Sequence, residues 1–235
     1  MIVWLASFPR SGNTFFRIAL HRRFRVPTYV VYDVDGVAEQ IGAELMGAQS
    51  RPKSFDQMRS SPEAYFVKTH RQRADPEVAE EDRAICLVRD GRDCVVSWAR
   101  LRTADFAGES DYEARFAAEA RSIITRRSGG TGHWGLNVRS WHESKAPQPV
   151  WVRFDDLVAD PLRIVESAVG AVAPGLQPVA DAEIPAFGDL REHDPGFFRA
   201  GATGTHRTEL PTDLHDLFWE QPENAAAMAL LDYPR

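Results

Sequence analysis

The chain has 235 residues, a length that suits one domain with a sizeable buried core. Apolar residues make up 43% and charged residues 26%, which is ordinary for a globular protein and excludes wholesale disorder. The formal net charge of −6 excludes a broad positive field that would attract nucleic acid. We therefore expect a single domain over residues 1–235, no nucleic-acid partner, and any anion site to be a local group of basic side chains.

Cysteine content and hydropathy indicate in which cellular compartment the protein lies. The two cysteines, Cys86 and Cys94, are too few for a disulfide framework or a zinc site, and each lies in an apolar run. Buried thiols in a reducing environment are the simplest interpretation. The apolar stretch at residues 1–7 is too short for a signal peptide, and no segment is long enough to span a bilayer. These features predict a cytoplasmic protein that does not associate with a membrane.

Apolar patterning predicts strands that alternate with helices along the chain. Strands are expected at 2–6, 64–68, 83–88 and 149–154, and helices at 14–24, 91–101, 111–127, 133–143 and from 155 onward. Asp90 is suited to cap the helix that follows it, whereas residues 27–63 carry no clear pattern. The alternation predicts an α/β fold of three layers with a central parallel sheet, in which ligands bind at the carboxyl ends of the strands.

The first strand-to-helix turn, residues 7–14, has the composition of an anion site. Backbone N–H groups at a helix start have no intrahelical partner, and Gly12 permits close approach to a ligand. Arg10 adds a fixed positive charge, and three side chains add donors: Ser11, Asn13 and Thr14. An ordinary capped turn explains this segment equally well. The Gly-Lys-Ser/Thr ending of ATP- and GTP-binding P-loops is missing, so the part that holds magnesium is not evident.

Four segments, in order, resemble those of sulfotransferases that use PAPS (3′-phosphoadenosine 5′-phosphosulfate). The stretch from Ser7 to Phe15 resembles the 5′-phosphosulfate loop, and Val67-Lys68-Thr69-His70 resembles the Lys-Thr-His segment. Residues 86–98 look like the 3′-phosphate motif, and residues 197–204 are similar to the C-terminal glycine loop. Residues 152–157 give a weaker match. The resemblance spans residue 2 to about residue 207, and it implies the P-loop NTPase-like sulfotransferase fold.

The resemblance also implies roles for individual residues. His70 would be the general base, because an imidazole can accept a proton near neutral pH. Lys68 would bind the sulfuryl oxygens, and Arg10 the bridging oxygen and the 5′-phosphate. The implied donor-binding residues are Arg10, Ser11, Gly12, Asn13, Thr14, Phe15, Arg89, Ser97, Phe154, Arg199 and Gly201. The implied reaction is direct in-line transfer from PAPS to a hydroxyl of a small-molecule acceptor, without a metal.

Several positions depart from the family pattern. Phe15 replaces a tryptophan and keeps a stacking face, Phe154 replaces a tyrosine and lacks its hydroxyl, and Ala200 replaces a lysine. Core packing is an alternative role for Phe15. Arg89 and Ser97 are expected to meet one phosphate only if their connection folds back over the ligand. Alternatively, Arg89 pairs with Asp90 or Asp93.

Other functions stay open at this point. A small-molecule or nucleotide kinase and a non-catalytic module that binds PAP (3′-phosphoadenosine 5′-phosphate) would use a similar scaffold. A carbohydrate or a peptide tyrosine would be an alternative acceptor within the family. Residues 27–63 and 102–134, which the motifs leave free, are expected to form the acceptor pocket. The sequence determines neither the acceptor, nor its reacting atom, nor the oligomeric state.

Overall fold

The computed structural model describes residues 1–145, 147–199 and 201–235. Its centre is a five-stranded sheet in the order β2-β3-β1-β4-β5, and every neighbouring pair is parallel. The strands are β1 (Ile2–Ser7), β2 (Thr28–Val30), β3 (Tyr65–Thr69), β4 (Arg83–Val88) and β5 (Val150–Arg153). The α/β class, the central parallel sheet and four of its strands confirm the sequence prediction. The fifth strand, β2, was missed because three residues are too few to show a period.

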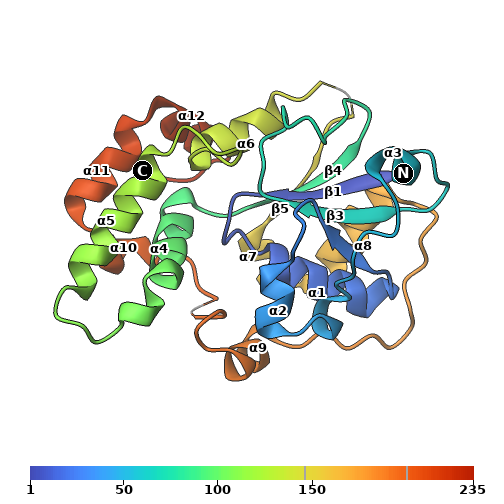
Figure 1. Cartoon of the computed structure of the whole chain (residues 1–235), viewed down its shortest axis with the longest axis horizontal. Coiled ribbons are helices and arrows are strands. Elements are labelled where there is room, and N and C mark those ends of the chain that lie inside the picture. Colours follow the sequence, from blue (N-terminus) through green and yellow to red (C-terminus); the bar gives the residue numbers. More distant parts are fainter. Residues whose placement is uncertain (146, 200) are drawn as a thin grey trace.

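Helices cover both faces of the sheet (Figure 1). One face packs against α1 (Asn13–Phe24) and α8 (Pro161–Val172), through a cluster that includes Phe16, Leu20 and Val169. The other face buries Trp4, Met58 of α3 (Phe55–Arg59) and Trp141 of α6 (Trp134–His142). Because β1 is buried on both faces, its sequence is apolar from Ile2 to Ala6.

A second group of helices gathers beside the sheet, on the left in Figure 1. It consists of α4 (Gly91–Arg102), α5 (Tyr112–Thr125), α10 (His206–Glu209), α11 (Thr212–Glu220) and α12 (Pro222–Leu230). Its own core includes Val95, Phe116, Leu214 and Met228. Asp90 caps α4 as expected, since its carboxylate accepts from the backbone N–H of Arg92 at 2.9 Å. The start of α4, which follows shortly after β4, is the part of this group that lies next to the sheet.

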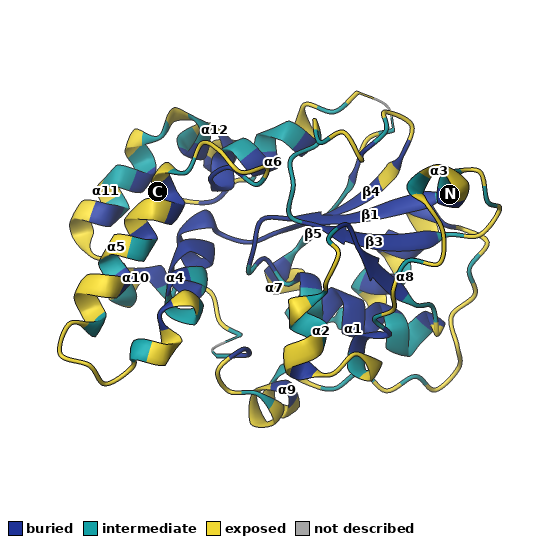
Figure 2. Ribbon diagram, viewed as in Figure 1, coloured by how far each residue is buried: buried dark blue, intermediate teal, exposed yellow. Residues whose placement is uncertain are grey.

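The remaining short elements are η1 (Glu44–Met46), η2 (Ala104–Phe106), α2 (Gly36–Ile41), α7 (Phe154–Ala159) and α9 (Phe187–His193). Strands β1 to β4 are buried almost throughout and β5 is mostly half-buried, whereas α5, α9 and α11 carry exposed outer faces (Figure 2). Cys86 and Cys94 are both buried free thiols, and burial raises the pKa of Cys94 to about 12. Within the described ranges, no helix combines the length and the apolarity that crossing a membrane requires.

Candidate active site

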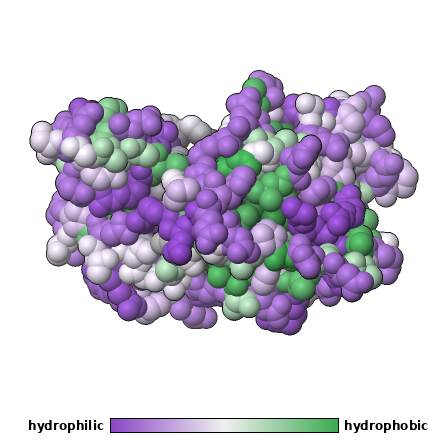
Figure 3. All heavy atoms as spheres, turned by 90° about the horizontal axis from the view of Figure 1, so that it is seen from below, coloured by the Kyte–Doolittle hydropathy of each residue, from purple (hydrophilic) through white to green (hydrophobic). Residues whose placement is uncertain are grey.

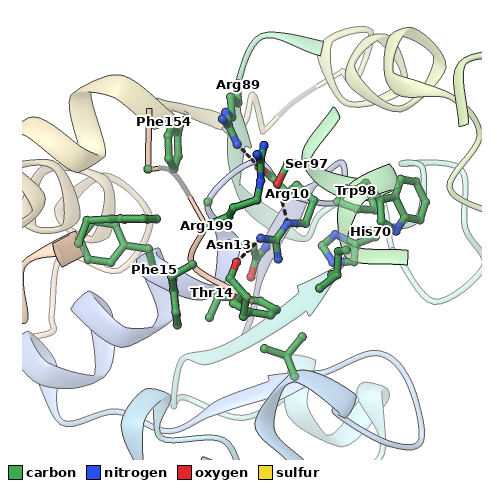
Figure 4. Close-up of a pocket in the computed structure, with 18 of the residues that line it drawn as sticks. Arg10, Asn13, Thr14, Phe15, His70, Arg89, Ser97, Trp98, Phe154 and Arg199 are labelled. Carbon is green, nitrogen blue, oxygen red and sulfur yellow. Dashed lines mark hydrogen bonds between the residues drawn. The ribbon is translucent and has the colours of Figure 1, made fainter. Parts of the chain in front are cut away.

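A cavity of about 280 Å³ opens where β1, β3, β4 and β5 end. All but one of the residues implied by the resemblance line it, and Ser11 is the exception. Figure 4 shows Arg10 near the middle, with His70 and Trp98 to one side and Phe15 and Phe154 to the other. The parallel sheet thus brings together motifs that lie far apart in the sequence.

The loop after β1 presents an open helix start to this cavity. Gly12 is the N-cap of α1 with φ of 97°, and the first turn of α1 contains no acidic residue. No side chain of the described residues caps it. The free N–H groups of this turn therefore favour an anion.

Two of the expected side-chain donors point elsewhere. Ser11 Oγ lies 3.4 Å from the Cys94 sulfur, and the Asn13 amide donates to Leu5 O at 2.9 Å and to Ser7 Oγ at 3.1 Å. These contacts fix the loop, whose backbone is left-handed at Arg10 and Gly12. Thr14 keeps its place on the cavity wall.

Gly12→Ala is expected to destabilise the protein by about 1–3 kcal/mol, since φ of 97° disfavours any side chain. A Cβ there would also approach Phe154 Cδ2 to 2.8 Å, so affinity for a phosphate-bearing ligand at this helix start is expected to fall as well. Thermal unfolding and calorimetry measure the two effects. Gly170→Ala in α8, where an added Cβ meets nothing within 4 Å, is the matched control and is expected to be neutral or slightly stabilising. Equal stability of the two variants would contradict this.

Three guanidinium groups lie around the cavity, those of Arg10, Arg89 and Arg199. Arg10 Nε donates to Ser97 Oγ at 3.0 Å, and its guanidinium carbon lies 4.4 Å from the centre of the Phe197 ring. Arg89 donates to the backbone oxygen of Arg10 at 3.4 Å and of Ala202 at 2.7 Å. Burial and the neighbouring Arg89 lower the pKa of Arg10 to about 10, so it stays charged at neutral pH. Arg10 therefore links Arg89 to Ser97 through hydrogen bonds to both.

The surroundings of Arg89 leave it available to a ligand. Its guanidinium carbon lies 4.6 Å from the centre of the Phe154 ring. Its Nε is buried and makes no hydrogen bond to any described residue, although Asp93 Oδ2 lies 4.0 Å away. Asp90 pairs with Arg92 at 2.7 Å instead. An orphaned buried donor of this kind suits an anion that completes the site.

Asp93, on α4, binds the segment that leads into α10, residues 197–206, which we call the C-terminal segment. Its carboxylate accepts from the backbone N–H groups of Gly204 at 2.7 Å and His206 at 2.9 Å, and from Thr205 Oγ1 at 3.1 Å. Burial opposes the charged form, but the hydrogen bonds from His206 and Gly204 hold the pKa of Asp93 well below its usual range. The sequence prediction gave Asp93 as an alternative partner of Arg89, and it missed this role.

The C-terminal segment adds Arg199 and Gly201 to the cavity wall. Arg199 pairs with Glu209 at 2.9 Å, and a Cβ on Gly201 would approach Phe187 to 2.3 Å. The expectation for Ala200 lies outside the described residues. Phe187, from α9, packs edge-on against Phe15 and Phe154 at ring distances of 5.9 and 6.4 Å. No local pattern in the sequence indicated Phe187.

Lys68 and His70 occupy the end of β3. The Lys68 ammonium lies 3.9 Å from Asp35 Oδ1, and burial together with Arg17 lowers its pKa to about 8. His70 Nδ1 lies 2.9 Å from the backbone oxygen of Ser7. Because a carbonyl only accepts, Nδ1 carries the hydrogen and Nε2 keeps its lone pair. Burial and the nearby Lys68 charge lower the pKa of His70 to about 3, below the near-neutral value that the sequence suggested.

The residues that line the acceptor side of the cavity differ from those expected from the sequence. From residues 27–63 and 102–134, the described lining contains only Val37. Trp98 and Leu101, on the second half of α4, take that place instead. Trp98 is the last residue of the 3′-phosphate motif, and Leu101 lies about one turn further along the same helix, which is the signal that could have indicated them. Among the described residues, no three His, Cys, Asp or Glu side chains gather in a way that could hold a metal ion.

A parallel sheet whose strand ends converge on an uncapped helix start and a ring of cations defines an α/β enzyme that binds a phosphate-bearing ligand. The sulfotransferase domain model matches residues 2–169. The chain therefore belongs to the sulfotransferase family of PAPS-dependent enzymes.

Solved structures agree with this assignment at the level of the fold. Mouse sulfotransferase SULT7A1, complexed with PAP, superposes with a TM-score of 0.64 at 14% identity, over 99% of this chain and 89% of that one. Retinol dehydratase with androsterone and PAP gives 0.55 at 16% identity, over 97% and 80%. The same enzyme with retinol and PAP gives 0.56 at 13% identity, over 97% and 81%. No curated protein sequence gives a significant match.

Proposed function

We propose that this enzyme transfers a sulfuryl group from PAPS to a hydroxyl of a small-molecule acceptor and releases PAP. The observation that carries the proposal is the arrangement of one cavity, in which His70 offers a free Nε2 beside Lys68 and Arg10. Family membership supports the reaction class. The similar structures, which are complexes with PAP, support the donor.

The residues present fit PAPS as donor. The open start of α1 and Arg10 would hold the 5′-phosphosulfate, since backbone N–H groups and a guanidinium both favour an anion. Arg89, Ser97, Arg199 and Gly201 would hold the 3′-phosphate, and the orphaned Arg89 Nε supports that assignment. Two aromatic rings, Phe15 and Phe154, would pack against the adenine.

His70 would act as the general base through Nε2. The backbone oxygen of Ser7 fixes the tautomer of His70, and burial keeps the imidazole neutral, so Nε2 is free to accept a proton. PAPS supplies a sulfuryl group whose bond to the 5′-phosphate oxygen breaks as the bond to the acceptor oxygen forms. His70 takes the acceptor proton and later returns it to solvent. Lys68 and Arg10 would offset the negative charge that develops on the sulfuryl and bridging oxygens.

The apolar lining at the acceptor end of the cavity favours an acceptor with an apolar body. Val37, Trp98 and Leu101 line the cavity. Figure 3 shows apolar side chains gathered near the middle of the face seen from below, where polar residues surround them. The retinol dehydratase structures hold androsterone and retinol, which are small molecules. We therefore propose a small-molecule hydroxyl as acceptor, ahead of a carbohydrate or a peptide tyrosine.

The test is incubation with labelled PAPS and a broad panel of alcohols, phenols and amines. We expect PAP release that depends on an acceptor, together with PAP binding by calorimetry. Absence of both would sink the proposal. PAP binding without turnover on any acceptor would favour a non-catalytic module, and magnesium-dependent binding of ATP would favour a kinase.

A further inference from the structure

Asp35 lies between two basic side chains that come from different elements. It is in the loop between β2 and α2, within the stretch to which the sequence assigned no pattern. Its Oδ2 accepts from Arg17 Nη2 at 2.6 Å, and its Oδ1 lies 3.9 Å from Lys68 Nζ. Among the described residues, no other carboxylate pairs with either cation. One carboxylate therefore serves both.

Arg17 fixes the position of this carboxylate. Its side chain, on α1, is 0% exposed, and its Nε donates to Thr28 Oγ1 at 3.0 Å. Thr28 in turn donates to the backbone oxygen of Met46 at 2.8 Å. A guanidinium held by a buried neighbour restricts the oxygen that it binds. Asp35 Oδ1 has no hydrogen-bond partner among the described residues, so it is left to face Lys68.

Lys68 needs such a partner. The charged or titratable groups around it are Arg17 from α1, Arg10 from the loop before α1, His70 at the end of its own strand, and Asp35. Asp35 alone among these favours the ammonium form. A buried ammonium that faces two guanidinium groups loses its proton readily when no carboxylate offsets them.

We propose that Asp35 is a positioning residue for sulfuryl transfer: its carboxylate, anchored by Arg17, holds the Lys68 ammonium charged and directed at the cavity. The inference rests on the proposed function for the role of Lys68, but the coupling between Asp35 and Lys68 is a property of the protein alone. It is therefore measurable even where no acceptor is known.

The sign of the pH effect follows from Lys68. Its pKa of about 8 lies below the ordinary lysine value, so charge stabilisation by Lys68 is present below pH 8 and is lost as the pH rises through about 8. Removing the Asp35 carboxylate takes away the contribution that favours the charged form. The pKa of Lys68 then falls further, and the loss occurs at a lower pH.

The sequence makes this titration simple to observe, because it contains only three lysines: Lys53, Lys68 and Lys145. Protein labelled with ¹³C-lysine gives three side-chain signals, which Lys53→Arg and Lys145→Arg assign. We expect the Lys68 signal to titrate near pH 8 in the wild type. In Asp35→Asn it should titrate about one pH unit or more lower, a tenfold loss of proton affinity. The alkaline limb of kcat/KM should move by the same amount.

Asp33→Asn is the matched control, since Asp33 is an exposed carboxylate two residues away from Asp35. The Lys68 signal should not move in this variant. An unmoved Lys68 signal in Asp35→Asn would overturn the inference. If that variant fails to fold, Lys68→Met gives the reciprocal measurement and leaves Asp35 paired with Arg17. Burial raises the pKa of Asp35, but Arg17 and Lys68 hold it below its usual value, so it should rise in Lys68→Met. No rise would equally overturn the inference.

The two proposals fail separately. A moved Lys68 signal in a protein that releases no PAP would defeat the proposed function and leave the coupling intact. Sulfuryl transfer with no change at Lys68 in Asp35→Asn would defeat the coupling and leave the function intact.

Discussion

Replacing His70 with Ala is expected to lower turnover by about 10²- to 10⁴-fold at neutral pH, the usual contribution of a positioned general base. PAP affinity is expected to change little, because His70 is neutral and lies apart from the aromatic end of the cavity. The fold should persist. The backbone of residue 70 keeps its hydrogen bonds with Tyr32 Oη at 2.9 Å and Asn137 Nδ2 at 2.8 Å when the imidazole is gone.

The measurement is the initial rate of PAP release at saturating PAPS, with calorimetric titration of PAP into each variant. His142→Ala is the control, because His142 is exposed near the end of α6 and does not line the cavity. It should match the wild type in both assays. Loss of PAP binding together with turnover in His70→Ala would assign His70 a structural role, and unchanged turnover would place the base elsewhere.

The sequence could predict which residues meet at the cavity, because these residues lie at or just after the carboxyl ends of the strands. Lys68 is the last residue but one of β3, and Arg89 and Phe154 directly follow β4 and β5. Strands buried on both faces give continuous apolar runs that are easy to find, and parallel strands place their carboxyl ends at one edge. Finding the strands therefore located the residues that meet at the cavity, although they lie far apart in the sequence.

What was not predictable depends on packing between distant segments. Asp35 meets Lys68, and Phe187 meets Phe15, with no periodic pattern in either surrounding stretch. The Asn13 amide binds Leu5 and Ser7 of the preceding strand, and the low pKa of His70 depends on burial. Composition and local spacing carry no information about such quantities, because they arise only once the helices have packed on the sheet.

Replacing Arg89 with Gln is expected to weaken PAP binding by about 10- to 100-fold, the usual cost of removing one charged partner from a buried ionic hydrogen bond. Binding of adenosine 5′-monophosphate, which lacks the 3′-phosphate, should weaken much less. The reason is the position of Arg89, with a buried Nε that makes no hydrogen bond to a described residue and a guanidinium packed on Phe154. Arg199 offers less, because its side chain is 35% exposed and already paired with Glu209.

Calorimetry with both nucleotides separates the 3′-phosphate contact from the rest of the site. Arg102→Gln, at the last residue of the helix that follows Arg89, is the matched control, since that side chain is 51% exposed and pairs with Glu119 outside the cavity. Thermal unfolding must accompany the titrations, because Arg89 also holds the backbone of Ala202. An equal loss for PAP and adenosine 5′-monophosphate would show that Arg89 supports the C-terminal segment instead of reading the 3′-phosphate. A loss confined to PAP would place that phosphate between β4 and the segment that Asp93 fastens.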